Sequence, residues 1–309
     1  MDFIPKNKIL EFRPDTIQVV RKQYDLDKPG RMQESITILN EWVQKQTHFK
    51  KKDFNLYYLE TLIIISKGSV EKAKSRLDRL CTMRTLLPQF FVYLFFIFRY
   101  IHRCSVVLPK LTEDHERVFL HKSIDAPTCA SQFMDFYKAN IIHAEYLRNH
   151  DYLNRFILVL DFSEANVMGH VTKMNPIDLR HAMSIYIEGY GMKIKAIYII
   201  SNSKFIDAFV TIFKQVLSPK VADRIQIYKS KEELQNVISK SILPKDYGGE
   251  ERSLKELQDE WLDILSTEEH MNYIREMNTA VTDESFRRRD KFTEQYAGMP
   301  GTFRLLTVD

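Results

Sequence analysis

The sequence predicts an α/β fold, in which a mainly parallel sheet with crossover helices follows a small all-α domain. Three short runs at residues 156–160, 194–200 and 225–228 are apolar and rich in residues that favour strands, and helical patterns lie between them. Strands of a parallel sheet have this composition because helices cover both of its faces. This alternation places the sheet in the second half of the chain.

The other elements follow in chain order. Apolar residues at helical spacing between 15 and 80, interrupted at Gly68 and Ser69, predict a small helical module. Residues 101–116 are predicted to be a polar connector, 118–121 the first strand, 128–148 a helix and 253–265 another helix. We therefore expect a helical N-terminal domain over 1–95, a binding domain over 96–265 and a charged C-terminal extension over 266–309.

The helix predicted at residues 203–217 has a narrow polar stripe. Nine of its residues are apolar, and the polar ones recur at Lys204, Asp207, Thr211, Lys214 and Gln215. This is more apolar surface than a helix needs to cover one side of a sheet. The pattern fits either a well-buried crossover helix or a helix that covers an apolar space.

Four segments of this region resemble the CRAL-TRIO family of lipid-binding proteins. They are GHVTKMNP at 169–176, KIKAIYIISNS at 193–203, FKQVLSPKVADRIQIY at 213–228 and ILPKDYGGE at 242–250, in which LPKDYGG is the most specific motif. The stretch at 69–91 is similar to the N-terminal domain of the family. The ending MPGTFRLLTVD at 299–309 is similar to the tail of its insect-type α-tocopherol-transfer-protein-like branch.

The resemblance implies a lipid cavity with a mobile gate formed by the helix at 203–217. The family has an Asn-x-Pro turn before this helix, whereas Ser201, Asn202 and Ser203 stand there in this chain. We expect serine and asparagine capping to make the turn instead. The arginine-rich run of the family is replaced by residues 63–66, which are Ile, Ile, Ile and Ser.

Composition favours a binding protein of the cell interior. The chain has 309 residues, a formal net charge of +4 and only three cysteines without close spacing, which argues against disulfide scaffolds and zinc sites. The mild charge fits an anionic membrane surface better than nucleic acid. The first residues lack the apolar core of a signal peptide, and the run at 90–98 is too short to span a bilayer. We expect a cytoplasmic monomer that associates peripherally with membranes.

The sequence predicts no catalytic residues, no cofactor and no metal. His143, Ala144 and Glu145 form the first half of a zinc-deaminase signature, but the second half is absent. Neither a nucleophile elbow nor a phosphate-binding loop occurs. We therefore expect a protein that is not an enzyme.

A lipid-transfer site needs an apolar cavity and a cationic rim that meets the membrane. We expect the cavity to be lined from the gate helix, from the strand at 156–160 and from the helix that precedes it. The predicted cavity and gate residues are Phe133, Tyr137, Phe156, Leu158, Leu160, Phe205, Phe209, Ile212, Phe213 and Val216. The sequence does not decide which sheet face is inward, because a continuous apolar run marks neither.

Three lysines are the predicted rim. Lys193 and Lys195 flank a strand residue and so are expected to point to the same side, and Lys220 follows the gate helix. By the resemblance, these positions correspond to headgroup-binding lysines of the family. An alternative is that they are ordinary exposed lysines.

The expected function is binding and transfer of a hydrophobic small molecule of the tocopherol, retinoid or carotenoid class, with docking and release aided by phosphoinositides. Two alternatives stay open. One is exchange of phosphatidylinositol or another phospholipid, with residues such as His170 at a polar pocket end. The other is a membrane-recruited adaptor that has no transferable ligand.

Overall fold

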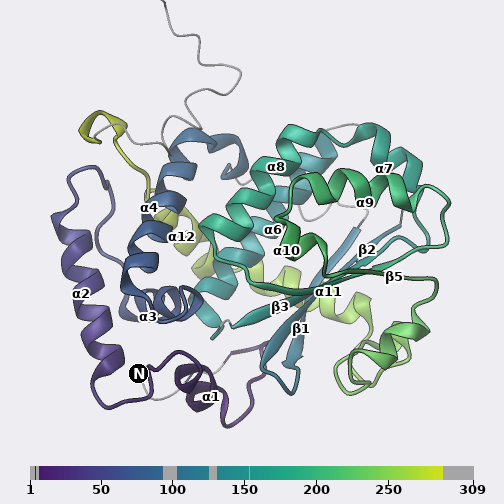
Figure 1. Ribbon diagram of the computed structural model, residues 1–309, viewed down its shortest axis with the longest axis horizontal. Helices are drawn as coiled ribbons and strands as arrows, with labels where there is room; N and C mark the ends of the chain where they lie inside the picture. Colours follow the sequence, from purple (N-terminus) through teal and green to yellow (C-terminus); the bar gives the residue numbers. More distant parts are fainter. Residues whose placement is uncertain (1–3, 5–6, 93–102, 125–130, 153, 288–309) are drawn as a thin grey trace, which may run out of the picture.

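The computed structural model describes residues 4, 7–92, 103–124, 131–152 and 154–287, and its centre is a five-stranded sheet in the order β1-β2-β3-β4-β5. The strands are β1 (Arg103–Leu111), β2 (Glu116–Ser123), β3 (Arg155–Asp161), β4 (Ile194–Ile200) and β5 (Ile225–Tyr228). β1 pairs antiparallel with β2, and all later pairs are parallel. The α/β fold with a mainly parallel sheet is confirmed (Figure 1).

The prediction of a polar connector at 101–116 is wrong, because β1 occupies most of this stretch. Val106, Val107 and Leu108 of β1 are completely buried. The strand also contains Pro109, and its register with β2 shifts between Val107 and Leu111. Proline removes a ladder donor and is tolerated on edge strands, which is the position of β1 in the described sheet.

Helices of the first hundred residues gather beside the sheet (Figure 1). They are α1 (Thr16–Lys22), α2 (Arg31–Lys45), α3 (Leu56–Ile65), α4 (Val70–Leu86) and the short η1 (Pro88–Phe90). All residues of α3 from Tyr57 to Ile65 are buried, because α2, α4 and α6 surround this helix. Asn55 and Ser69 cap α3 and α4 by accepting backbone hydrogen bonds from Tyr58 and Lys72.

The crossover segments place a layer of helices in front of the sheet in Figure 1. The described elements are α6 (Ser131–His150), α7 (Val167–Lys173), α8 (Pro176–Ser184), the π-helical η2 (Ile185–Gly189), α9 (Ile206–Gln215) and α10 (Pro219–Ala222). Side chains of these elements form one apolar cluster with Leu160, Ile197 and Ile199 of the sheet. Within this cluster lies the site described below.

The chain after β5 supports the other side of the sheet. It forms η3 (Glu232–Asn236), η4 (Lys245–Tyr247), α11 (Leu254–Leu265), α12 (Glu268–Met277) and η5 (Glu284–Phe286). A capping box of Ser253 and Glu256 starts α11, and the Trp261 indole of this helix donates a 2.9 Å hydrogen bond to the Val107 carbonyl. Leu254 and Leu257 belong to one core cluster with the alternate residues Ile157 and Val159 of β3.

Residues 266–287 contact the N-terminal helices. Thr282 pairs with Phe49 in an isolated bridge, and the Arg287 guanidinium binds both carboxylate oxygens of Asp78 at 2.6 Å. Lys51, which is buried, makes ion pairs with Asp53 and Glu276. The domain boundaries at 95/96 and 265/266 stay predictions.

Most of the apolar run at 90–98 and all of the tail motif at 299–309 lie outside the described residues. Phe90 and Phe91, which are described, are buried. No helix within the described ranges is long and apolar enough to cross a membrane.

Candidate functional site

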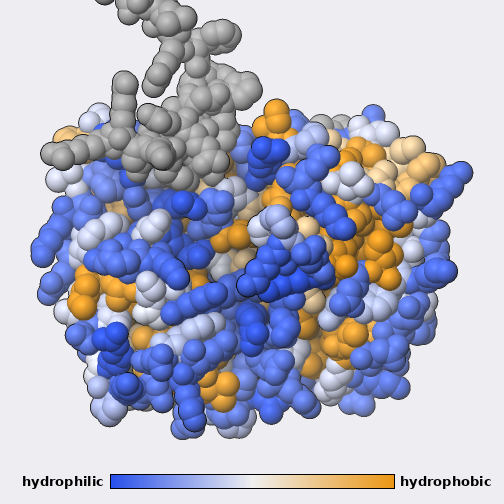
Figure 2. All heavy atoms as spheres, viewed as in Figure 1, coloured by the Kyte–Doolittle hydropathy of each residue, from blue (hydrophilic) through white to orange (hydrophobic). Residues whose placement is uncertain are grey.

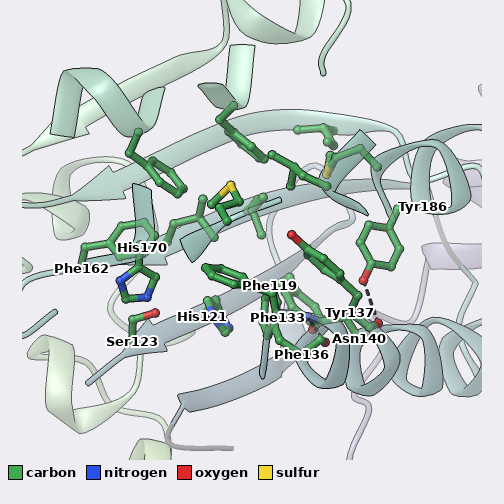
Figure 3. A pocket seen from close by; sticks show the side chains of 18 of the residues that line it. Phe119, His121, Ser123, Phe133, Phe136, Tyr137, Asn140, Phe162, His170 and Tyr186 are labelled. Atoms are coloured by element: carbon green, nitrogen blue, oxygen red, sulfur yellow. Dashed lines mark hydrogen bonds between the residues drawn. The ribbon is translucent and has the colours of Figure 1, made fainter. Parts of the chain in front are cut away.

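A pocket lies between one face of the sheet and the helices α6 to α9. Space that no protein atom occupies amounts to about 1040 Å³, counting the part that opens to solvent. The walls are mainly aromatic and aliphatic side chains, and Figure 3 shows them converging from strands and helices.

The structure brings seven of the ten predicted cavity residues to this pocket. They come from α6, β3 and α9, and they are Phe133, Tyr137, Phe156, Leu158, Leu160, Phe209 and Phe213. The other three, Phe205, Ile212 and Val216, are partly buried against the same apolar cluster but do not line the pocket.

Alternation along β3 determines which sheet face is inward. Leu158 and Leu160 line the pocket, whereas Ile157 and Val159 belong to the core cluster that includes α11; Phe156, at the start of the strand, lines the pocket and also belongs to that core cluster. Successive side chains of a strand point to opposite faces of the sheet. A continuous apolar run can therefore pack against apolar residues on both faces. This is the physical reason why the sequence alone could not choose the face.

Helix α9, which the sequence predicts to be a gate, presents an aromatic edge to the pocket. Phe209 and Phe213 stack with ring centroids 5.8 Å apart, and Phe209 contacts Phe162 edge-to-face at 4.7 Å. On the opposite side of the helix, Asp207 and Thr211 are exposed. The helix is therefore amphipathic in its packing, although its sequence is apolar around most of its circumference.

Serine side chains make the turn that leads into α9, as expected for a chain without the Asn-x-Pro sequence. The Ser201 hydroxyl accepts a hydrogen bond from the Ser203 N–H, and the Ser203 hydroxyl accepts one from the Phe205 N–H, both at 3.2 Å. Asn202 is exposed. Two successive serine turns thus replace a proline at this position.

Besides the predicted Tyr137, polar side chains at the pocket come from His121 and Ser123 of β2, Asn140 of α6 and His170 of α7. Of these four, sequence reasoning named His170 alone. Tyr186 donates a 2.9 Å hydrogen bond to the Tyr137 carbonyl at the α6 wall, as Figure 3 shows. No sequence motif links them, because they come from three different elements, β2, α6 and α7.

Lys193 is half-buried below the N-terminal helices. Its ammonium donates to the Tyr24 hydroxyl at 2.9 Å and to the Ile64 carbonyl at 3.2 Å, and it lies 4.4 Å from the Tyr24 ring centroid. Burial, together with the charges of Lys67, Arg76 and Arg155, lowers the pKa of Lys193 to about 7. Basic groups therefore gather around this side chain.

The other two predicted rim lysines have different surroundings. The Lys195 ammonium lies 3.6 Å from Oε1 of Glu116, whereas Lys220 is exposed on α10. The register of β3 with β4 shifts at this point. Phe156 pairs with Ile194, and the next residue, Ile157, pairs with Ala196, so Lys195 has no partner on β3. Strict alternation breaks at this point, so it does not place Lys193 and Lys195 on one side. Figure 2 shows hydrophilic residues gathered over α10 and hydrophobic ones over and below α9.

The half-motif His143-Ala144-Glu145 has a structural role. Glu145 is buried, pairs with Arg84 and accepts a 2.6 Å hydrogen bond from the Tyr190 hydroxyl. Burial lowers the pKa of His143 to about 4, and its ring packs 5.1 Å from that of Trp261. Among the described residues, no group of three or more His, Cys, Asp or Glu is arranged to hold a metal ion.

The LPKDYGG motif holds the end of β3. Its Tyr247 reaches Asp161 by a hydrogen bond, and both residues are buried. A Cβ atom on Gly249 would lie 1.8 Å from the Leu243 carbonyl oxygen, so no side chain fits there. The motif therefore fixes the loop behind the sheet and does not line the pocket.

Comparisons with known proteins find a family model and several relatives that match part of this chain. The sequence model of the family described as CRAL/TRIO domain matches residues 112–249. The α-tocopherol transfer protein-like proteins of Homo sapiens, Pongo abelii and Mus musculus are each 24% identical over 98 residues, which is 31% of this chain and 28% of theirs. The match thus spans less than a third of the length of these relatives.

A solved structure, titled "Crystal structure of Sfh5", aligns with a TM-score of 0.43 at 12% identity, over 87% of this chain and 98% of that chain. The segment that matches the family contains β2 to β5, α6 to α10 and the LPKDYGG motif. All twenty pocket-lining residues lie within it. Residues 112–249 therefore match the CRAL/TRIO domain model, and this segment holds the pocket.

Proposed function

We propose that this protein binds a lipophilic small molecule in the pocket and transfers it between membranes. The observation that carries the proposal is the pocket wall, which is mainly apolar and has no Lys, Arg, Asp or Glu among the described residues that line it. Transfer of apolar surface from water into such a site is favourable by about 25 cal/mol per Å². The family match supports the same function.

The ligand class that we propose is that of tocopherols, retinoids and carotenoids. Relatives named α-tocopherol transfer protein-like support it, although they match this chain over only 98 residues. A phospholipid headgroup would carry a buried phosphate, and among the lining residues only His121 and His170 could provide a positive charge for it. For this reason we place phospholipid exchange second.

We further propose that phosphoinositides dock the protein and promote release. The exposed Lys220 and the half-exposed Lys195 can meet a membrane directly. Lys67, Arg76 and Arg155, whose charges lower the pKa of Lys193, add positive potential nearby. A lysine near an anionic surface contributes about 1 kcal/mol to membrane binding. In this proposal the protein is a cytoplasmic monomer, it is not an enzyme, and its contact with membranes is peripheral.

Native mass spectrometry of the protein purified from eukaryotic cells, combined with lipid extraction, tests the proposal. A single bound mass that extracts as a neutral lipophilic molecule is expected. Bound phospholipid would favour exchange of phospholipids. Protein without bound lipid, and without uptake of added hydrophobic ligands, would favour the adaptor and contradict the proposal.

A further inference from the structure

The Asn140 side chain is the polar group of the pocket whose chemistry is most sharply defined. It projects from α6, is 7% exposed, and lines the pocket beside aromatic residues (Figure 3). Its amide nitrogen Nδ2 donates a 3.0 Å hydrogen bond to the Phe136 carbonyl. This contact fixes the orientation of the amide, because the opposite orientation would set two oxygen acceptors against each other.

The orientation leaves Oδ1 of Asn140 as a buried acceptor with no hydrogen-bond partner among the protein groups described. Buried amide oxygens are normally paired, and an unpaired one costs free energy that only a donor can recover. The rest of this wall is mainly apolar and aromatic, and no described protein group donates to this oxygen. Oδ1 of Asn140 can therefore accept a hydrogen bond from a donor group of the ligand.

We infer that the ligand carries an uncharged hydroxyl group that donates a hydrogen bond to Oδ1 of Asn140. The inference rests on the proposed function and deepens it, because it selects among lipophilic molecules by their polar group. An alcohol or a phenol satisfies the amide oxygen. An aldehyde, ketone or ester offers only acceptors, which would face this oxygen unfavourably, and a pure hydrocarbon leaves it unpaired.

Ionised groups fit the pocket less well than a hydroxyl. A carboxylate offers only acceptors and would bury a negative charge where no lysine or arginine lines the wall. Ser123, 1% exposed near His170 in Figure 3, is a second polar group without a hydrogen-bond partner for its hydroxyl oxygen in the described structure. A serine hydroxyl both donates and accepts, so it does not discriminate between the classes. Asn140 is the residue that sets the requirement for a donor.

The test compares probes that differ only in the polar group. Binding of retinol, retinal and retinyl methyl ether, and of α-tocopherol and its methyl ether, is measured by fluorescence titration or by competition with a bound fluorophore. Wild-type protein should bind each hydroxyl compound about tenfold more tightly than its partners without a donor, which corresponds to about 1.4 kcal/mol. In the variant Asn140→Leu, the preference should vanish, and the methyl ethers should bind at least as well as to wild type.

A matched control is Asn149→Leu, which removes an amide from the same helix outside the pocket lining and should keep the preference for hydroxyl compounds. Thermal unfolding of both variants shows that they are folded. Equal affinity of wild type for alcohols and ethers, or an unchanged preference in Asn140→Leu, would overturn the inference while leaving the carrier function in place. If no probe of either kind binds to wild type, the proposed function fails for these lipids and the inference falls with it.

Discussion

The phenol of Tyr247 donates a hydrogen bond of 2.6 Å to Oδ2 of Asp161, and this bond joins the LPKDYGG motif to the last residue of β3. Asp161 also accepts a 2.8 Å bond from the Ser163 N–H through its other oxygen. Both side chains are at most 1% exposed. The LPKDYGG motif, which is the most specific motif of the family, thus holds the end of β3 in place behind the cavity.

Loss of this phenol should destabilise the fold. Tyr247→Phe leaves a buried carboxylate oxygen without its donor, so we expect the free energy of unfolding to fall by about 2 kcal/mol. Urea denaturation measures the change. Tyr228→Phe is the control, because that phenol bonds to the exposed Gln226 and its loss should cost less than about 0.5 kcal/mol. Equal effects of the two substitutions would contradict the role given to Tyr247.

The second glycine of the motif should tolerate no side chain. Gly249→Ala would place a methyl group against the Leu243 backbone, which cannot give way as a flexible side chain would. Gly30→Ala serves as the comparison, since Gly30 has a positive φ of 77° but nothing within 4 Å of the added atom. We expect Gly30→Ala to cost about 1 kcal/mol from backbone strain alone and Gly249→Ala to cost clearly more, by thermal or urea unfolding. A larger loss of stability in Gly30→Ala than in Gly249→Ala would show that the loop around Gly249 can shift to make room for a side chain.

Charges on the pocket side of the gate should abolish ligand retention. In the double variant Phe209→Asp and Phe213→Asp, two carboxylates would stand where the helix meets an apolar ligand. The α/β core should remain folded by circular dichroism, and copurified lipid should be absent by mass spectrometry. The control places the same two charges on the exposed side of the helix, as Ala208→Asp and Thr211→Asp, and should retain lipid. Normal retention in the first variant would refute the gate.

Membrane docking should depend on the predicted rim lysines, which should contribute unequally to the binding free energy. The triple change of Lys193, Lys195 and Lys220 to Ala should weaken binding to phosphoinositide vesicles by up to about 3 kcal/mol at low salt and flatten its salt dependence. Because Lys193 bonds inside the protein, Lys195 and Lys220 should account for most of the loss. Uptake of an apolar ligand from detergent should hardly change.

The matched control for docking is the change of the exposed lysines 229, 240 and 255 to Ala, which removes the same charge elsewhere. Vesicle sedimentation compares the two triple variants. If both bind equally, the rim acts only through net charge. If ligand uptake collapses in the rim variant, the cavity and the rim are not separate.

The buried Lys193 should make stability depend on pH. Its pKa is about 7 in the folded protein and near the ordinary value of 10.5 in the unfolded chain. Between these values the unfolded chain binds the proton and the folded protein does not, so this residue makes stability rise with pH in that window. Lys193→Met should therefore stabilise the protein most, relative to wild type, near pH 7, and this difference should shrink towards pH 9. A difference that is independent of pH in urea denaturation would contradict the burial of this ammonium.

Sequence reasoning found the elements of the fold that have a clear apolar run or a clear helical pattern of apolar residues. The runs at 156–160, 194–200 and 225–228 correspond to β3, β4 and β5, and the helix at 203–217 contains α9. It missed β1, because Pro109 and the polar residues around 101–105 hide a strand whose valines are buried. An antiparallel edge strand lacks the long apolar run by which central parallel strands are recognised.

For the candidate site, the sequence indicated the aromatic and aliphatic residues, but it did not show which of them face the pocket. Phe209 and Phe213 face the pocket, whereas Phe205, Ile212 and Val216 of the same region pack beside it. The difference depends on the orientation of α9 against β3, which the apolar pattern does not encode. Asn140 could not be found at all, since a single asparagine within a helix has no pattern around it.

The two sides of β3 separate ligand selection from folding. Leu158 and Leu160 contact the cavity, and their neighbours Ile157 and Val159 hold the opposite core. Substitutions at the even-numbered positions therefore reshape the space that a ligand sees, while the odd-numbered positions keep the sheet assembled. In the proposed carrier, one set of residues can therefore change the bound ligand without any rebuilding of the domain.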